Sequence, residues 1–208
     1  MVLVFDLDDT LCETDAYSEQ YILNFIKQHN LPYKLIQHTA RFAEKKFDWD
    51  VDTALRWYKQ YGDEMMLNFP AKLNAVKVIN RLHDLGHRIV IATARATDWH
   101  TNPKDITLQW LQNMGLKYDK LYIGRVDKEL ICEAEHADVF MDDDLNITSR
   151  VAEHLGHTGI QVFMATSDYN KDKEVPDGVV RVDDMKNMLR EISVNRTHFK
   201  KNNQEYMH

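Results

Sequence analysis

The sequence predicts an α/β fold: a Rossmann-like parallel sheet with helices on both faces and a small helical cap inserted after the first strand. Three observations favour it. Short apolar runs that do not alternate with polar residues recur along the chain, as in strands buried on both faces. Stretches with apolar residues three and four positions apart lie between these runs and predict helices. One segment, residues 16–69, contains no convincing strand pattern.

The elements follow from these patterns in chain order. The predicted strands are Val2–Phe5, Arg88–Ala92, Lys120–Ile123, Asp138–Met141 and Gln161–Met164. The predicted helices of the α/β part are Ala71–Leu85, Asn102–Met114, Lys128–Ala137 and Asn146–Leu155. Gly86, Gly115 and Gly156 follow three of these helices as stop signals, and Pro103 lies near the start of one.

The segment from residue 16 to residue 69 is predicted to be helical and is rich in aromatic residues. Because it directly follows the first strand, we expect it to form a cap over the strand ends. We expect most of its rings to pack against one another. The predicted organisation is a core of residues 1–15 and 70–194, a cap of residues 16–69 and a polar, frayed tail of residues 195–208.

Composition limits the class of protein. The 208 residues are 44% hydrophobic and 28% charged, as in a globular protein, and the net charge of −7 argues against extended nucleic-acid binding. No run approaches the roughly 18 apolar residues of a membrane span, and Asp6 interrupts the first apolar run. Two cysteines provide no disulfide framework, so we expect a cytoplasmic location. Whether the chain forms a homodimer is left open.

Reactive side chains follow three of the predicted strands. They are Asp6, Asp8, Thr93, Arg95, Asp142, Asp143 and Asp144. Acid-rich turns are common where strands lead into helices, so each group alone has an ordinary explanation. Together they would meet at one sheet edge, where two charges about 4 Å apart repel by about 4 kcal/mol at an effective dielectric constant near 20. The sequence therefore predicts a site for a hard cation such as Mg²⁺, with an anion above it.

The order of these motifs is similar to that of a known superfamily. DLDDT after an apolar strand, then ATAR, then a lysine and then MDDD resembles the haloacid dehalogenase superfamily of phosphohydrolases. The matches span roughly residues 2 to 170, and the superfamily admits a helical cap between its first two motifs. The resemblance implies a Mg²⁺-dependent phosphomonoesterase that forms an aspartyl-phosphate intermediate.

The resemblance also implies a role for each matching residue. Asp6 would be the nucleophile and a Mg²⁺ ligand. Asp8 would protonate the leaving oxygen and then activate water, and its backbone carbonyl would bind the metal. Thr93 would hold a phosphoryl oxygen. Asp142 would complete the metal site, with Asp143 as a neighbouring acid or a further ligand.

The third-motif lysine has two candidates, and two acidic residues depart from the superfamily pattern. Lys128, in GRVDKEL, fits the third motif best, and Lys120, at the head of a predicted strand, is the alternative. The lysine would neutralise charge on the phosphoryl group and on the nucleophile. Asp9 stands where glycine is commonest in the superfamily, and Asp144 stands where the residue is often not acidic.

A finer resemblance concerns the second half of the chain. TLQWLQNMGLKYDKLYIGRVDK, HADVFMDDDLNI and the later DYN resemble the cytosolic-type 5'(3')-deoxyribonucleotidases and their bacterial or phage relatives. The cap matches that family poorly. The implied substrate is a nucleoside monophosphate, which would be hydrolysed to nucleoside and phosphate.

Aromatic and basic residues of the cap and of the loop after Thr93 could contact such a substrate. Stacking of a base on an aromatic ring contributes about 1–3 kcal/mol, and the cap offers Phe42, Phe47, Trp49 and Trp57. Arg41 and Arg95 would contact phosphate or sugar, or else form surface salt bridges. Trp99 and His100 follow Thr93 and would lie near the entrance of the site.

Other functions remain as alternatives. One is a phosphatase of the same superfamily that acts on another small phosphoester or on a nucleic-acid 3'-phosphate end. A different class is a catalytically inactive protein that keeps the fold for binding or regulation. The sequence leaves the base, the sugar and the choice between 5' and 3' phosphate open.

Overall fold

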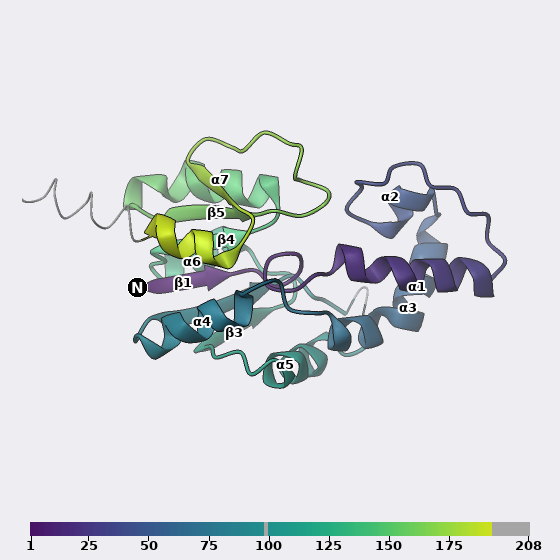
Figure 1. Ribbon diagram of the computed structural model, residues 1–208, viewed down its shortest axis with the longest axis horizontal. Coiled ribbons are helices and arrows are strands. Elements are labelled where there is room, and N and C mark those ends of the chain that lie inside the picture. The colour runs from purple at the N-terminus through teal and green to yellow at the C-terminus, as the bar shows by residue number, and fades with distance from the viewer. Residues whose placement is uncertain (98–99, 193–208) are drawn as a thin grey trace, which may run out of the picture.

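A six-stranded parallel sheet forms the centre of the computed structural model, which describes residues 1–97 and 100–192 (Figure 1). Its strands are β1 (Val2–Phe5), β2 (Arg88–Thr93), β3 (Lys120–Ile123), β4 (Val139–Asp142), β5 (Gln161–Ala165) and β6 (Val179–Val182). They lie in the order β3-β2-β1-β4-β5-β6, and every neighbouring pair is parallel. The predicted Rossmann-like α/β fold is confirmed.

The sheet is covered on both faces, because successive residues of a strand point to opposite sides. Leu3 and Phe5 of β1 belong to one buried cluster, and Val4 belongs to another. The first cluster includes apolar residues of α4 (Ala75–Asp84) and α5 (Pro103–Asn113), and the second includes those of α6 (Lys128–Ala134) and α7 (Leu145–Leu155). The continuous apolar runs of the sequence are therefore explained by burial on both faces.

Most predicted boundaries agree with the structure to within one residue, but two helix ends and one strand differ more. The helix predicted at Ala71–Leu85 begins four residues later, because Lys72 N donates to the Leu11 carbonyl and Asn74 has a positive φ of 64°. Leu73, which the predicted range had included in this helix, is 73% exposed. α6 ends at Ala134, ahead of His136 with its positive φ of 51°. The edge strand β6 was missed because Arg181 interrupts its short apolar run.

Helices α1 (Asp15–Gln28), α2 (Ala43–Phe47) and α3 (Val51–Asn68) lie between β1 and α4, and residues 16–69, all described, contain no strand. Figure 1 shows these helices as a separate lobe beyond the carboxyl end of β1. Several aromatic rings of this lobe pack together: the centroid of the Trp49 ring lies 5.5 Å from that of Phe25 and 6.1 Å from that of Trp57.

The predicted tail, residues 195–208, lies outside the described residues. In the described ranges, none of the helices has the length and apolar character that a bilayer span requires.

Candidate active site

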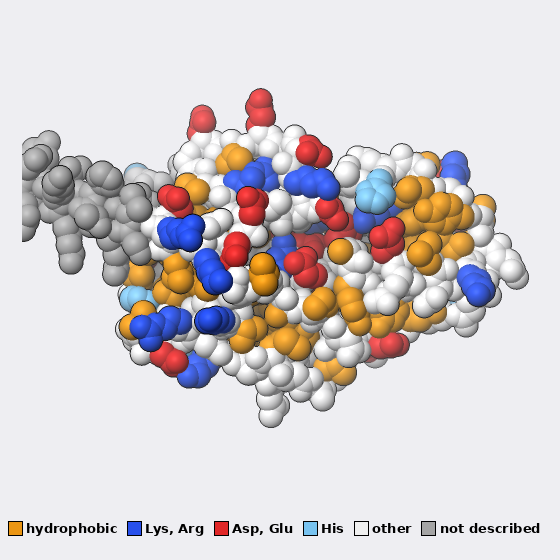
Figure 2. Space-filling view, viewed as in Figure 1, with side chains coloured by type: hydrophobic (Ala, Val, Ile, Leu, Met, Phe, Trp, Pro, Cys, Tyr) orange, Lys and Arg blue, Asp and Glu red, His pale blue; other side chains and the backbone are white. Residues whose placement is uncertain are grey.

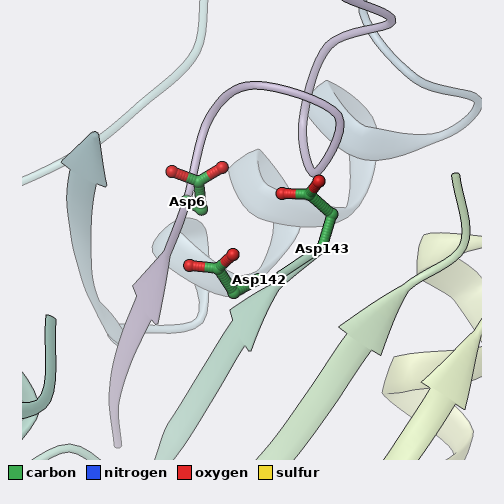
Figure 3. Close-up of side chains that lie close together, drawn as sticks. All are labelled: Asp6, Asp142 and Asp143. Carbon is green, nitrogen blue, oxygen red and sulfur yellow. The ribbon is translucent and has the colours of Figure 1, made fainter. Parts of the chain in front are cut away.

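Three buried carboxylates meet at the carboxyl ends of two neighbouring strands. Asp6 directly follows β1, Asp142 ends β4, and Asp143 comes next (Figure 3). One carboxylate oxygen of each lies within 4.8 Å of those of the other two. Asp6 N donates to the Met141 carbonyl over 2.9 Å, which holds the two strand ends in register. Parallel pairing of β1 and β4 thus brings together residues that are far apart in the sequence.

A buried lysine bridges two of these carboxylates. Lys128, at the start of α6, donates from Nζ to Asp6 Oδ1 and to Asp142 Oδ2, each over 2.6 Å. The Asp127 side chain caps the same helix by accepting from the backbone N–H groups of Glu129 and Leu130. Of the two lysines that the sequence left open, Lys128 is the one at the strand ends.

Lys120 lies elsewhere, at the exposed start of β3. Its Nζ donates to Glu135 Oε1 over 2.6 Å, and Glu135 also accepts from the Tyr122 hydroxyl and from Arg88. These contacts, led by the hydrogen bond from Lys120, lower the pKa of Glu135 to about 2. This cluster stabilises the edge of the sheet and takes no part in the site.

The lowered pKa of Glu135 predicts an acid-sensitive contribution to stability. The native pKa of Glu135, about 2, lies below the ordinary value of 4.5. The stabilisation by this carboxylate is therefore complete at pH values above 4.5 and disappears as the pH falls toward 2. We expect Glu135→Gln to lower the free energy of unfolding at pH 7 by up to about 1 kcal/mol. Urea unfolding of both proteins as a function of pH measures this; a difference that persists below the native pKa would contradict it.

The three carboxylates exceed the positive charge beside them. Burial raises the pKa of Asp6 and of Asp143 to about 7 each, and it also raises the pKa of Asp142. Lys128 opposes the shift at Asp6 and Asp142, while neighbouring carboxylates reinforce it. Lys128 and the more distant Arg41 leave the pKa values of these buried carboxylates raised, so the ionised cluster calls for a further cation.

The donor atoms fit a hard divalent cation. Asp143 Oδ2 is buried and has no hydrogen-bond partner among the described residues. The guanidinium of Arg41 approaches it only to 4.0 Å. Carboxylate oxygens at this spacing are the ligands that Mg²⁺ prefers, and Asp6, Asp142 and Asp143 would hold it. The Asp8 carboxylate is not part of this group.

A cation at this position would stabilise the folded chain. At a Mg²⁺ concentration about 100 times the dissociation constant, the gain is about 2.7 kcal/mol. For a chain of this size we expect the melting temperature to rise by about 5–10 °C over that in EDTA. Thermal unfolding by circular dichroism, with Ca²⁺-free buffers, measures the shift. Asp143→Asn should remove most of it, and an equal shift in that variant would contradict the assignment.

Asp8 is held by a buried arginine. Arg95 donates from Nε and Nη2 to the Asp8 carboxylate at 2.9 and 2.7 Å, and from Nη1 to Thr107 Oγ1 at 3.2 Å. Thr93 Oγ1 lies 3.4 Å from Asp8 Oδ2. Burial alone would raise the pKa of Asp8, but Arg95 outweighs it and the pKa is lowered. The surface salt bridge considered for Arg95 is thus a buried one.

The two acids that depart from the superfamily pattern both have local structural roles. Asp9 has a positive φ of 52°, and its Oδ1 accepts from the backbone N–H groups of Thr14 and Asp15. Burial raises its pKa to about 6. Asp144 caps α7 and pairs with Arg41. Asp9 therefore connects the loop after β1 to the start of α1, and Asp144 connects α7 to the helical lobe.

Two contacts of the site could not be found by sequence reasoning. The Tyr169 hydroxyl donates to the Asp143 carbonyl over 2.6 Å, and Asn170 Nδ2 donates to the same oxygen over 2.9 Å. Arg41 lies over the Tyr169 ring at 5.3 Å. The sequence offered the DYN motif, residues 168–170, only as part of a family resemblance. A loop after a strand has no periodic pattern from which such contacts could be predicted. In the structure, Tyr169 and Asn170 of this motif hold the backbone carbonyl of Asp143 in place.

A cavity of about 470 Å³ lies between the helical lobe and the strand ends. In Figure 2 acidic side chains gather where these two parts of the molecule meet. Asp8 and Arg95 line the cavity from the sheet side. From the helical lobe and the loops come Arg41, Phe42, Glu44, Trp57, Tyr58, Phe69 and His100.

Of the four aromatic residues that the sequence suggested as substrate contacts, two line the cavity and two do not. Phe42 and Trp57 line it. Phe47 and Trp49 do not: Phe47 is buried in the packing of the lobe, and its ring lies 5.7 Å from that of Trp49. Trp49 packs within the lobe against Phe25 and Phe47 and does not line this cavity. Trp99 lies outside the described residues.

Comparison with known proteins gives the fold. No family model matches the chain, and no curated protein matches its sequence. A haloacid dehalogenase-like hydrolase from Streptococcus pneumoniae is similar in structure, with a TM-score of 0.62, 14% identity and coverage of 91% of this chain and 97% of its own. A predicted phosphoglycolate phosphatase from Haemophilus somnus has a TM-score of 0.62, 18% identity and coverage of 92% and 97%.

A predicted phosphatase from Clostridium acetobutylicum is similar as well, with a TM-score of 0.59, 14% identity and coverage of 92% of this chain and 97% of its own. At such low identity the likeness concerns the fold, and it extends over nearly the whole length of each protein. The chain has the haloacid dehalogenase-like fold that its sequence motifs predict.

Proposed function

We propose that the protein is a Mg²⁺-dependent phosphomonoesterase that acts on nucleoside monophosphates through an aspartyl-phosphate intermediate. The observation that carries the proposal is the cluster of Asp6, Asp142, Asp143 and Lys128 at the strand ends, beside a cavity large enough for a nucleoside. Cavities of several hundred Å³ are typical of small-molecule sites. A fold alone does not specify activity, so the proposal depends on this cluster.

In the first step a carboxylate oxygen of Asp6 attacks phosphorus, and the bond from phosphorus to the leaving oxygen breaks. Asp8 gives its proton to that oxygen, which departs as the nucleoside hydroxyl. In the second step Asp8 takes a proton from water, the water oxygen attacks phosphorus, and the bond to Asp6 breaks to release phosphate. Lys128 offsets the charge on Asp6 and on the phosphoryl group, and bound Mg²⁺ would neutralise phosphoryl oxygens. Thr93 would hold one phosphoryl oxygen.

The pairing of Asp8 with Arg95 bears on this sequence. It favours the ionised carboxylate, which suits the second step, in which Asp8 acts as a base. For the first step Asp8 must carry a proton. A phosphate dianion bound beside it raises its pKa through like-charge repulsion, so substrate binding itself favours the protonated form.

The walls of the cavity support the proposed substrate class. Phe42, Trp57, Tyr58 and Phe69 offer flat apolar surfaces suited to a nucleobase. Arg41 lines the same cavity and lies 4.0 Å from Asp143, between the carboxylates and the aromatic walls. A ligand with phosphate at one end and an aromatic ring at the other fits this arrangement.

We further propose that residues 16–69 act as a cap on a core of residues 1–15 and 70–194. Asp9 accepts hydrogen bonds from Thr14 and Asp15 at the start of α1, so the loop that follows the nucleophile is joined to the first cap helix. A salt bridge between Arg41 of the lobe and Asp144, at the start of α7, also joins the two parts. A cytoplasmic location and the possibility of a homodimer stay as predictions.

The proposal is tested by release of inorganic phosphate, measured with and without Mg²⁺. The substrates are nucleoside 5'- and 3'-monophosphates, sugar phosphates, phosphoglycolate and a 3'-phosphorylated oligonucleotide. We expect turnover of nucleotides that EDTA abolishes. Release only from sugar phosphates, phosphoglycolate or the oligonucleotide would retain the phosphatase and reject the nucleotidase. No release from any substrate would favour the inactive binding protein.

A further inference from the structure

Arg41 joins the helical lobe to the strand ends on the side of α2. It lies in the segment between α1 and α2, and Figure 1 shows α2 and α5 on opposite sides of the molecule in this view. Its guanidinium pairs with Asp144, which caps α7, and lies over the Tyr169 ring at 5.3 Å. On the side of α5 other contacts join the lobe to the core, among them the hydrogen bond from Thr101 N to Asp63 Oδ1 over 3.2 Å. Arg41 is therefore placed to hold the lobe against the core on the side of α2.

The acid cluster of Asp6, Asp142 and Asp143 is covered in this structure. Asp6 is 3% exposed, and Asp142 and Asp143 are fully buried. None of the three is among the residues that line the cavity of about 470 Å³, whereas Arg41 lines it. The Arg41 guanidinium also lies 4.0 Å from Asp143 Oδ2, so it borders both the cavity and the cluster. A cation or a phosphate that enters through the cavity therefore meets Arg41 before it meets Asp143.

The contact between Arg41 and the cluster is electrostatic. Burial opposes ionisation of the guanidinium, but the charge of Asp143, followed by those of Tyr169 and Asp144, outweighs it and raises the pKa of Arg41. The Asp143 side chain is 1% exposed, so water screens this attraction only weakly. A divalent cation bound by Asp143 would place two positive charges beside the guanidinium, where one negative charge had held it. The hold of Arg41 on the cluster thus depends on the net charge of the cluster.

We propose that Arg41 is a clasp that closes or opens according to the charge of the cluster. While Asp6, Asp142 and Asp143 hold no metal, Arg41 is attracted to them and keeps the lobe against the strand ends. When these carboxylates hold Mg²⁺, Arg41 is attracted less and releases the lobe, which opens the way to the cluster. A phosphate bound at the cluster restores negative charge there, and Arg41 returns. The inference rests on the cation site of the proposed function and adds a regulation of access to it.

The first test is calorimetric titration of Mg²⁺ into the metal-free protein. Because binding must displace Arg41 from Asp143, Arg41→Gln should bind Mg²⁺ at least about fivefold more tightly than the wild type, a size typical of coupling between two sites. Arg41→Lys keeps the positive charge and should stay within about twofold of the wild type. Arg150→Gln, at an exposed position of α7 outside the cavity, makes the same chemical change and should leave the affinity unchanged. Equal or weaker binding by Arg41→Gln would overturn the inference.

The second test can be made on the wild type alone. Hydrogen exchange of backbone amides is followed by mass spectrometry in EDTA and in saturating Mg²⁺. In the wild type Mg²⁺ should speed the exchange of residues 37–46, which include Arg41, while the amides of β1 and β4 should exchange no faster. In Arg41→Gln residues 37–46 should exchange rapidly already in EDTA, with no further effect of Mg²⁺. Unchanged or slower exchange of residues 37–46 on addition of Mg²⁺ to the wild type would overturn the inference.

Inorganic phosphate gives a third measurement. With Mg²⁺ present, its addition should restore slow exchange of residues 37–46 in the wild type and should not do so in Arg41→Gln. Equal restoration in the two proteins, or restoration in neither, would show that Arg41 does not return to a bound anion and would overturn the inference.

Failure of the proposed function gives a different result. None of these measurements uses a nucleotide, so the expected differences without any nucleotide turnover would reject the nucleotidase and retain the clasp. Nucleotide turnover together with equal Mg²⁺ affinities of wild type and Arg41→Gln would do the reverse. If neither protein binds Mg²⁺, the cation site is wrong and the clasp is rejected with it.

Discussion

Asp6→Asn is expected to lower the kcat for phosphate release by at least about 10³-fold, because an amide cannot form the aspartyl-phosphate. The substitution keeps the size of the side chain and an oxygen that can accept from Lys128. It also removes one of three buried carboxylates that repel one another. We therefore expect the variant to be folded, with a melting temperature in EDTA at least as high as that of the wild type.

The comparison is a steady-state phosphate-release assay beside thermal unfolding of the same preparations. Asp52→Asn, in the exposed first turn of α3, makes the same change away from the site and should keep full activity. Residual activity of Asp6→Asn above about a tenth of the wild type, which corresponds to a barrier raised by only about 1.4 kcal/mol, would contradict a nucleophilic role. Loss of activity accompanied by unfolding would be recognised from the melting curve.

The strand ends of this protein were predictable because the signal is local. A parallel strand buried on both faces must be apolar throughout, so the first charged residue after it marks the strand end, as Asp6 does after β1. The parallel topology then brings Asp142 to the same edge. β6 was not predicted because the run VVRV at the sheet edge is short and its partly buried Arg181 breaks the apolar pattern.

Pairings between side chains were not predictable in the same way. Whether Arg95 contacts substrate or a neighbouring acid depends on where the loop after β2 turns, and the structure pairs it with Asp8. Phe42 and Trp49 lie on either side of the short helix α2, where no helical periodicity shows which side chain is buried, so they looked equivalent in the sequence. In the structure Phe42 lines the cavity and Trp49 packs within the lobe.

Lys128→Met is expected to have the largest effect on stability. The lysine is 4% exposed and contacts both Asp6 and Asp142, so its removal leaves two buried carboxylates without their partner. Breaking a buried pair in this way costs about 3–5 kcal/mol. We expect this loss in EDTA at pH 8, measured as the free energy of unfolding in urea. Lys120→Met, which disrupts only the exposed pair with Glu135, should cost no more than about 1 kcal/mol.

The loss should depend on pH and on Mg²⁺ because of the same carboxylates. The native pKa of Asp6 and of Asp143 is about 7, above the ordinary value of 3.8, so the native state retains protons that the unfolded chain releases between these values. Stability without metal therefore falls as the pH rises through this range, and it should fall more steeply without Lys128. Mg²⁺ should recover part of the loss in Lys128→Met, since it would bind the same oxygens, and none in Lys120→Met beyond the wild-type gain. Equal stability of the two lysine variants in EDTA would show that the carboxylates are not ionised together, and the charge balance proposed for the site would then be wrong.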